Sequence, residues 1–321
     1  MPKPIVGLHH VTAIASDPQR NLDFYSQVLG LRFVKRTVNF DDPSSYHFYF
    51  GDDIGSPGTI LTFFAWPLAS PGSVGIGETS SVAFNVPVSS LDFWERRLLS
   101  SGVPVEDLGD RLGDRILSFG DPNGMRVELA GADFGQQVRR PRTSDIPDEH
   151  SIRGFHSVTL CEAGFESTAR VLETLGFLKS EQENNRIRFA AESYAPGRYV
   201  DVLIQPQLVY GHMGAGTIHH IAFRAAEDAS QLEWRNVLAS LSLNVTPVLD
   251  RNYFHSIYFR EPGGVLFEIA TDPPGFEVDE PPESLGESLK LPFWLEEHRA
   301  RVEHVLPPIE MPHLKVGSKH G

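Results

Sequence analysis

Four segments of the chain carry the same pattern of polar and apolar residues, and each is followed by a stretch with helical periodicity. Alternation within the segments is typical of a β-strand with one buried face. The second and fourth copies end in similar hairpins, so that Glu128 follows Ser81 by 47 residues and Glu268 follows His220 by 48. This internal repeat predicts four copies of one supersecondary unit. The repeated segments are residues 9–12, 80–84, 156–159 and 219–223.

Each copy reads as a strand, a helix and three further strands, a βαβββ module. In the first copy Asp17 can cap the helix, Pro18 suits its first turn and Gly30 follows its last turn. Leu22 and Tyr25 lie at helical spacing and should face the sheet. One module cannot cover both faces of its sheet, so two modules should lie side by side around a cup with the helices outside. The predicted fold class is α+β, with four βαβββ modules in two tandem halves.

A polar, proline-bearing stretch near the middle of the chain predicts the boundary between the halves. We expect two modules in residues 1–138, a linker over 139–152, two modules in 153–272 and a C-terminal tail over 273–321. The tail is rich in proline and glutamate and contains one short helix candidate at residues 293–305. It should wrap the surface of the protein.

Composition narrows the classes of function. Of the 321 residues, 40% are hydrophobic and 22% are charged, which is typical of a globular protein. The net charge of −14 argues against binding to nucleic acid or to an anionic membrane surface. The single cysteine, Cys161, cannot form an internal disulfide, which suits a reducing cytosol. No signal peptide or membrane-spanning run is recognisable, so we expect a cytoplasmic protein.

The repeat uses histidine unevenly. Its second position reads His10, Ser81, Ser157 and His220 in the four copies. Strand alternation places His219 on the more apolar face, toward the helix, and His220 in the cup. The same alternation places Glu268 in the cup, and His10 has the phase of His220. Two imidazoles and one carboxylate form the set that binds iron(II) and leaves coordination positions open.

Other interpretations of these residues exist. A lone strand histidine is more often a hydrogen-bonded core residue than a ligand. A set of His156, His220 and Glu268 would apply if the third and fourth modules shared one cup. However, His156 has the phase of His9 and His219, so we favour His10. Glu128 has the hairpin context of Glu268 but Ser81 as its partner, and we interpret it as a structural relic.

Several motifs together resemble the ring-cleaving dioxygenases of the vicinal-oxygen-chelate (glyoxalase/bleomycin resistance/extradiol dioxygenase) superfamily, in particular its hydroquinone 1,2-dioxygenase-like group. These motifs lie at residues 8–12, 33–38, 46–52, 55–59, 153–157, 218–220, 250–254 and 258–268. The resemblance covers nearly the whole chain and implies the glyoxalase-like fold. It implies Fe²⁺ bound by His10, His220 and Glu268, with Mn, Zn or Ni as alternatives in the isolated protein.

The resemblance also implies catalytic roles for a second group of residues, namely His9, Thr12, His219, Arg251 and Tyr258. His255 is an additional polar group near the expected site. The implied activity is iron(II)-dependent, extradiol-type cleavage of an aromatic para-diol, in aromatic compound catabolism. The implied partners are a small aromatic substrate and O₂, while homo-oligomer formation stays open. The alternatives are a glyoxalase-like, metal-dependent lyase or isomerase and a non-catalytic, small-molecule binding protein of the bleomycin-resistance type.

Overall fold

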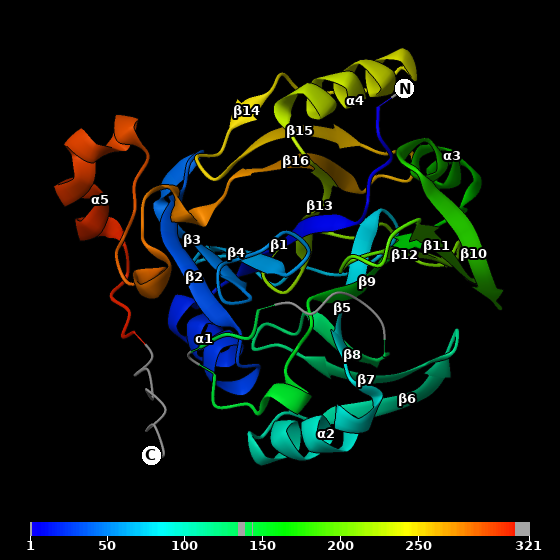
Figure 1. Cartoon of the computed structure of the whole chain (residues 1–321), viewed down its shortest axis with the longest axis horizontal. Helices are drawn as coiled ribbons and strands as arrows, with labels where there is room; N and C mark the ends of the chain where they lie inside the picture. The colour runs from blue at the N-terminus through cyan, green and yellow to red at the C-terminus, as the bar shows by residue number, and fades with distance from the viewer. Residues whose placement is uncertain (1, 134–138, 143, 312–321) are drawn as a thin grey trace.

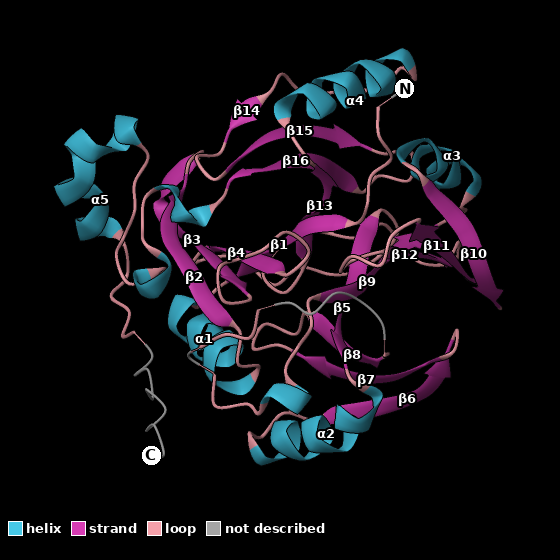
Figure 2. Ribbon diagram, in the orientation of Figure 1, coloured by secondary structure: helices cyan, strands magenta, loops and turns pink. Residues whose placement is uncertain are grey.

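The computed structural model describes residues 2–133, 139–142 and 144–311, and these form two curved eight-stranded sheets (Figures 1 and 2). The four predicted βαβββ modules are all present, which confirms the fold class. The first module comprises β1 (Leu8–Ala15), α1 (Pro18–Asp23), β2 (Arg32–Asn39), β3 (Asp42–Gly51) and β4 (Ile60–Ala65). The second comprises β5 (Glu78–Val86), α2 (Leu91–Ser100), β6 (Val105–Arg111), β7 (Asp114–Gly120) and β8 (Arg126–Gly131).

The second pair of modules repeats this order. The third module comprises β9 (Phe155–Glu162), α3 (Glu166–Leu175), β10 (Phe177–Glu183), β11 (Arg186–Ala191) and β12 (Tyr199–Ile204). The fourth comprises β13 (Ile218–Ala225), α4 (Asp228–Ser240), β14 (Leu249–Asp250), β15 (Phe254–Arg260) and β16 (Leu266–Pro274). In Figure 2 the helices α1 to α4 lie on the outer side of the curved sheets.

Each sheet combines one module from each half of the sequence. The first sheet has the order β14-β15-β16-β13-β1-β4-β3-β2, with β1 antiparallel to β13. The second has the order β10-β11-β12-β9-β5-β8-β7-β6, with β5 antiparallel to β9. The first module therefore shares its cup with the fourth, and the second with the third. The division of the chain into two halves stays a prediction, and its boundary at residue 138 lies outside the described residues.

Local sequence signals explain where α1 begins and ends. Asp17 is the N-cap residue and accepts a hydrogen bond from the Arg20 N–H, and Pro18 occupies the first turn. A π-helical turn, Phe24–Val28, continues the helix, and Gly30 follows with φ of 68°. Leu22 and Tyr25 are completely buried against the sheet. The predicted capping and facing of this helix are confirmed.

Two groups of apolar residues lie on opposite faces of the first sheet. Phe267 and Ile269 of β16, and Val265 just before that strand, point to the main core, as predicted, together with the helices. Ala270 of the same strand belongs to a smaller cluster inside the cup. That cluster is completed by side chains from several elements, namely Val34, Tyr49, Ile60, Ala222, Tyr253, Phe254, Phe276 and Leu285. One end of the cup is therefore filled by apolar side chains.

The C-terminal tail contributes to this filling, so the expectation that it merely wraps the surface is incomplete. Phe276 packs against Tyr49 with ring centroids 5.1 Å apart. The fully buried ammonium of Lys35 lies 2.5 Å from a carboxylate oxygen of Glu280, which fastens the tail to β2. The predicted helix at residues 293–305 is a 3₁₀ turn, Phe293–His298, followed by α5 (Arg299–Val305). Residues 312–321 of the predicted tail lie outside the described residues.

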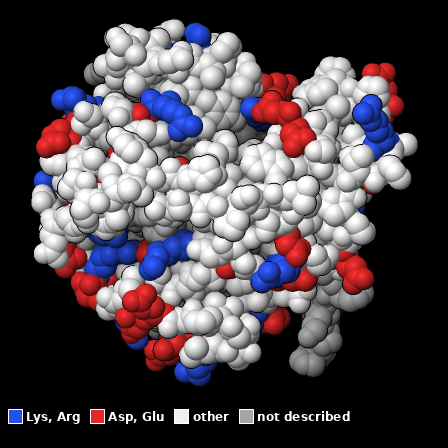
Figure 3. All heavy atoms as spheres, turned by 180° about the vertical axis from the view of Figure 1, so that it is seen from behind, with Lys and Arg blue, Asp and Glu red and all other residues white. Residues whose placement is uncertain are grey.

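Described residues of the predicted linker pack against the first module. Ile146 is buried against Gly30, and Arg142 forms an ion pair with Asp53 at 2.6 Å. On the face seen in Figure 3, acidic and basic side chains lie interspersed and no broad basic field is seen there. Among the described residues, no helix is long and apolar enough to cross a membrane.

Candidate metal centre

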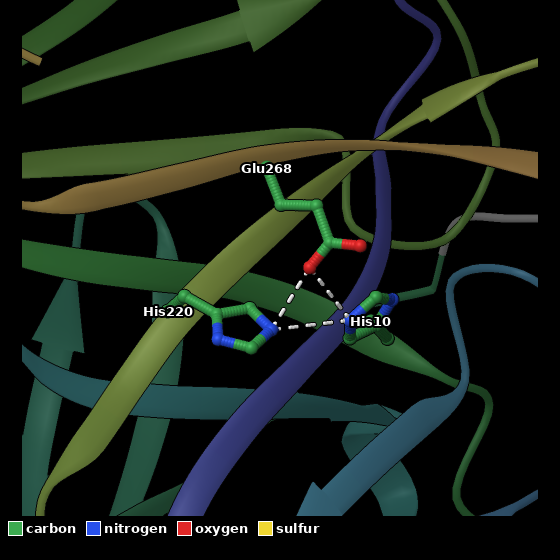
Figure 4. A group of neighbouring side chains, drawn as sticks. All are labelled: His10, His220 and Glu268. Atoms are coloured by element: carbon green, nitrogen blue, oxygen red, sulfur yellow. Dashed lines mark hydrogen bonds and ion pairs between the residues drawn. The ribbon is translucent and has the colours of Figure 1, made fainter. Parts of the chain in front are cut away.

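The side chains of His10, His220 and Glu268 meet inside the first cup (Figure 4). Their ligand atoms lie within 4.8 Å of one another, and all three residues are buried. Oε2 of Glu268 is 2.9 Å from Nε2 of His220 and 3.2 Å from Nε2 of His10. Three neighbouring strands bring them together, because β13 pairs with β1 on one side and with β16 on the other.

A pair of β-bulges shapes this part of the sheet. Between β1 and β13, Leu8 and His10 oppose the consecutive residues Phe223 and Ala222, so His9 is an extra residue on β1. Farther along, Thr12 opposes His220 and Ala13 opposes Ile218, so His219 is the extra residue on β13. A bulge re-aims side chains, which simple alternation cannot describe. His219 accordingly lines the cavity, and the prediction that it faces the helix is wrong.

The two bulged histidines contact the candidate ligands. His9 Nδ1 is 2.9 Å from His10 Nδ1, and His219 Nδ1 is 2.7 Å from His220 Nδ1. A ring that offers the lone pair of Nε2 to a metal keeps its proton on Nδ1. His10 and His220 can therefore each donate that proton to the neighbouring imidazole. This is the outer hydrogen bond that metal-bound histidines usually make.

The charges at the site agree with a cation-binding role. Burial disfavours the ionised form of Glu268, yet the imidazoles of His10 and His220 hold its pKa well below the usual range. Burial lowers the pKa of His220, and it lowers that of His219 to about 3. At neutral pH the site thus combines the carboxylate of Glu268 with the neutral imidazoles of His219 and His220. A carboxylate and a neutral imidazole are the protonation states that bind a divalent cation.

The hydrogen bonds of Glu268 leave room for such an ion. Oε1 accepts a hydrogen bond of 2.5 Å from the Ser256 hydroxyl. Oε2, which faces the two Nε2 atoms, has no well-oriented donor within the described part of the chain. Buried carboxylate oxygens are rarely left in this state. The donor set and this unsatisfied oxygen together fit a transition-metal ion.

A cavity of about 360 Å³ opens beside the candidate ligands. Of the five residues predicted to be catalytic, Thr12, His219, Arg251 and Tyr258 line this cavity. His9 does not line it within the described residues, because it lies behind His10 against the ring of Phe254. Any contribution of His9 must therefore act through His10.

Two residues on the hairpin strand β15 occupy different sides of the sheet. Tyr258 lies directly opposite Glu268 in the β15–β16 pairing, with the guanidinium of Arg251 5.5 Å from its ring centroid. Burial and the Glu268 carboxylate raise the pKa of the Tyr258 phenol, which therefore keeps its proton.

His255 points away from the cavity and contacts Asp228 of α4 at 2.6 Å. The expectation that His255 adds a polar group near the site is wrong.

The sequence interpretation missed a hydrogen-bonded chain on the opposite wall. His47 Nε2 is 2.8 Å from Thr62 Oγ1, and Thr62 donates to Thr12 at 2.9 Å. Tyr49 OH is 3.0 Å from His47 Nδ1. The alternation of residues 46–50 could have predicted that His47 and Tyr49 face the cup. Tyr46, Phe48 and Phe50 belong to the main core, and the two residues between them line the cavity.

The second cup has the same framework, with Ser81 and Ser157 at the repeat positions of His10 and His220. Glu128 opposes Ala83 as Glu268 opposes Ala222, so the two glutamates hold equivalent positions. Arg111 precedes Glu128 by 17 residues, as Arg251 precedes Glu268. Arg111 donates to both oxygens of Glu128, at 3.1 and 2.5 Å. In the second cup, the guanidinium of Arg111 thus supplies the positive charge beside the Glu128 carboxylate.

The alternative ligand set is not brought together. His156 belongs to β9 in the second sheet, whereas His220 and Glu268 belong to the first. His156 contacts Ser157 Oγ at 3.0 Å and Asp114 at 3.1 Å. It is the extra residue of a bulge between β5 and β9, and is therefore the counterpart of His9 and His219.

Comparisons with known proteins agree with this description. Residues 7–129 match the family described as "Glyoxalase/Bleomycin resistance protein/Dioxygenase superfamily". The chain is 44% identical over 312 residues to the Bacillus subtilis protein named "Putative ring-cleaving dioxygenase MhqO", covering 97% of this chain and 99% of that protein. It is 34% identical over 310 residues to a chlorohydroquinone/hydroquinone 1,2-dioxygenase of Sphingobium indicum, covering 92% and 94% of the two chains.

Solved structures show the same fold. The crystal structure of a "putative dioxygenase" from Bacillus subtilis superposes with a TM-score of 0.92 at 44% identity, covering 97% of this chain and 99% of that one. Glyoxalase I from Zea mays superposes with a TM-score of 0.59 at 14% identity, covering 83% and 92%. At this low identity, the second likeness concerns the fold alone.

Proposed function

This chain belongs to the glyoxalase/bleomycin resistance protein/dioxygenase superfamily, and we propose that it is an iron(II)-dependent, extradiol-type ring-cleaving dioxygenase acting on an aromatic para-diol. The observation that carries the proposal is the meeting of His10, His220 and Glu268 beside a cavity of about 360 Å³. That volume suits a small, single-ring substrate. The relatives named as ring-cleaving dioxygenases, one of them a hydroquinone 1,2-dioxygenase, support the substrate class.

His10, His220 and Glu268 would hold the metal. When bound, iron(II) supplies the Lewis acidity and one-electron chemistry that link an aromatic ring to dioxygen. The apolar cluster at the closed end of the cup, which includes Phe254 and Ala270, excludes water from one side of the site. The protein contributes a dry, shaped site that orients the ring.

Arg251 and Tyr258 are the proposed substrate-binding donors. The guanidinium of Arg251 is protonated at every accessible pH and has no lone pair for a metal, so it acts on substrate oxygen. The Tyr258 phenol keeps its proton and can donate it to the same oxygen or to a neighbouring one. Both donors favour negative charge that develops on the ring oxygen as the reaction proceeds.

Thr12 and His219 are proposed to donate from other walls of the cavity. Thr62 donates its single hydroxyl proton to Thr12. Its oxygen can therefore only accept in the contact with His47, which requires a proton on Nε2 of His47. His47 Nδ1 then accepts from Tyr49, and the Thr12 hydroxyl proton remains available to a ligand. His219, if it accepts the Nδ1 proton of His220, carries its own proton on Nε2.

Anaerobic loading with iron(II), followed by oxygen uptake, tests the proposal. Hydroquinone, catechol and a methylglyoxal–glutathione mixture would be compared at equal iron content. We expect oxygen uptake and ring opening with hydroquinone and slower turnover of catechol. Preferred turnover of catechol would overturn the para-diol class. Conversion of methylglyoxal–glutathione without oxygen uptake would indicate a glyoxalase-like enzyme, and failure to retain iron would favour a binding protein.

A further inference from the structure

An ion pair crosses the mouth of the cavity. Arg251 Nη2 lies 3.3 Å from Asp41 Oδ2, and both residues line the cavity. Arg251 directly follows β14, whereas Asp41 lies in the turn between β2 and β3. Since β14 and β2 are the two edges of the first sheet, this contact joins the edges of the curved sheet across the opening (Figure 1).

The two partners differ in their exposure to solvent. The side chain of Asp41 is 75% exposed, whereas that of Arg251 is 20% exposed. Within the described lining of the cavity, Arg251 is the sole lysine or arginine and Asp41 the sole acidic residue. Asp41 therefore offsets the single fixed positive side-chain charge of that described lining. Because Asp41 is largely exposed, solvent screens its attraction to Arg251, and the pair should contribute little to stability.

The turn holds Asp41 in this place. The Asn39 side-chain oxygen accepts a hydrogen bond of 3.0 Å from the backbone N–H of Asp41. Phe40 packs against Trp294 of the tail, with ring centroids 5.7 Å apart. Asp42, the next residue, does not line the cavity and instead accepts hydrogen bonds from Ser44. Asp41 thus faces the cavity, whereas Asp42 stabilises the turn through its hydrogen bonds with Ser44.

We propose that Asp41 determines the charge of the ring substituents that the cavity accepts, admitting uncharged para-diols and disfavouring rings that carry a carboxylate or another anionic group. This inference rests on the proposed function, because it assigns Arg251 to the substrate. An anionic substituent would have to displace Asp41 from Arg251 and would then meet its repulsion. A neutral hydroxyl can use another of the five guanidinium N–H groups and leave the pair intact.

Binding of benzoate and phenol, measured anaerobically by calorimetry on iron(II)-loaded protein, tests the charge filter without turnover. Asp41→Asn preserves the shape of the side chain and removes its charge, and Asp42→Asn is the matched control on the same turn. We expect Asp41→Asn to bind benzoate roughly three- to tenfold more tightly at low salt and phenol within about twofold of the parent. Unchanged benzoate affinity, or an equal gain in Asp42→Asn, would overturn the proposal.

Kinetics provide the second arm. The ratio of kcat/KM for 2,5-dihydroxybenzoate to that for hydroquinone should rise in Asp41→Asn and stay constant in Asp42→Asn. A constant ratio in Asp41→Asn would overturn the inference while oxygen uptake with hydroquinone still supports the proposed function. If the parent protein neither retains iron nor consumes oxygen, the proposed function fails, and the same benzoate and phenol measurement on the unloaded protein still tests Asp41.

Discussion

Tyr258 stands directly opposite Glu268 in the antiparallel pairing of β15 with β16. In the second sheet the corresponding pair is Ser118 and Glu128. The same backbone framework thus places a phenol beside the carboxylate in the cup that holds His10 and His220. It places a small hydroxyl beside the carboxylate in the other cup. The chemistry of the first cup is set by side chains at a few repeat positions, since the strand pairings around the two glutamates are alike.

The metal set can be tested by single substitutions. His10→Ala should lose bound iron, because one of three converging ligand atoms is removed. His156→Ala should retain iron, since His156 lies in the other sheet. Metal content after anaerobic loading and desalting checks both variants. Loss of iron in His156→Ala with retention in His10→Ala would show that the wrong modules had been paired.

Arg251 and Tyr258 are predicted to act on the substrate and not on the metal. Arg251→Ala and Tyr258→Phe should retain iron and lose turnover, each by about 2–4 kcal/mol of transition-state stabilisation, with Arg251→Ala the more severe. Tyr210→Phe, on an exposed tyrosine outside the cavity, is the control. Steady-state oxygen uptake at measured iron content gives the values. Parent-like turnover in both variants would leave these residues without a catalytic role.

The hydrogen-bonded chain behind Thr12 should matter for rate. Thr62→Val removes the hydroxyl that donates to Thr12 and accepts from His47, with little change of shape. We expect kcat for hydroquinone to fall by roughly two- to tenfold, which corresponds to one hydrogen bond, with iron retained. Thr37→Val is a matched control, because Thr37 is buried and its hydroxyl has no hydrogen-bond partner in the described structure. Equal kcat in the two variants would contradict the role of the chain.

The second cup should depend on Arg111 for stability and not for activity. Arg111→Ala leaves the buried carboxylate of Glu128 without its cation and should lower the free energy of unfolding by about 3–5 kcal/mol. Replacing both residues, as Arg111→Met with Glu128→Leu, should recover most of that loss. Urea unfolding measures both variants. Iron content and turnover should stay at the parent level in the double variant, and a loss of iron there would contradict a purely structural role.

A buried carboxylate pair near the junction of the two sheets predicts a pH dependence of stability. Burial and the carboxylate of Glu261 raise the pKa of Glu162 to about 8. Glu261 accepts hydrogen bonds from Thr168 and from the backbone N–H groups of Gly263 and Val265. Glu162 therefore keeps its proton in the folded state, whereas the unfolded chain loses it near pH 4.5.

Because the folded state holds the extra proton between these two values, the free energy of unfolding should decrease as the pH rises from about 4.5 to about 8 and then level off. Glu162→Gln should remove this part of the pH dependence and be the more stable form, relative to the parent, at pH above 8. Urea unfolding across that range checks it, with Glu166→Gln as an exposed control. A parallel decline in Glu162→Gln and in the parent would refute the assignment.

Much of the architecture follows from the sequence alone, because local signals and periodicity are short-range. The four modules follow from alternation and repeat length, and α1 follows from Asp17, Pro18 and Gly30. Phase within the repeat grouped His10 with His220 and Glu268, the same side chains that the structure brings together. Their binding of iron stays a prediction.

Only the tertiary structure decided the details on which the chemistry depends. The bulges at His9 and His219 arise from the register between strands more than 200 residues apart, which no local pattern encodes. The contact between Asp41 and Arg251 exists because the sheet curves until its edges meet, and the direction of His255 depends on α4. The sequence by itself determined which residues could form a site. The non-local pairing of strands decided which of them face one another, because register and curvature are properties of the assembled sheet.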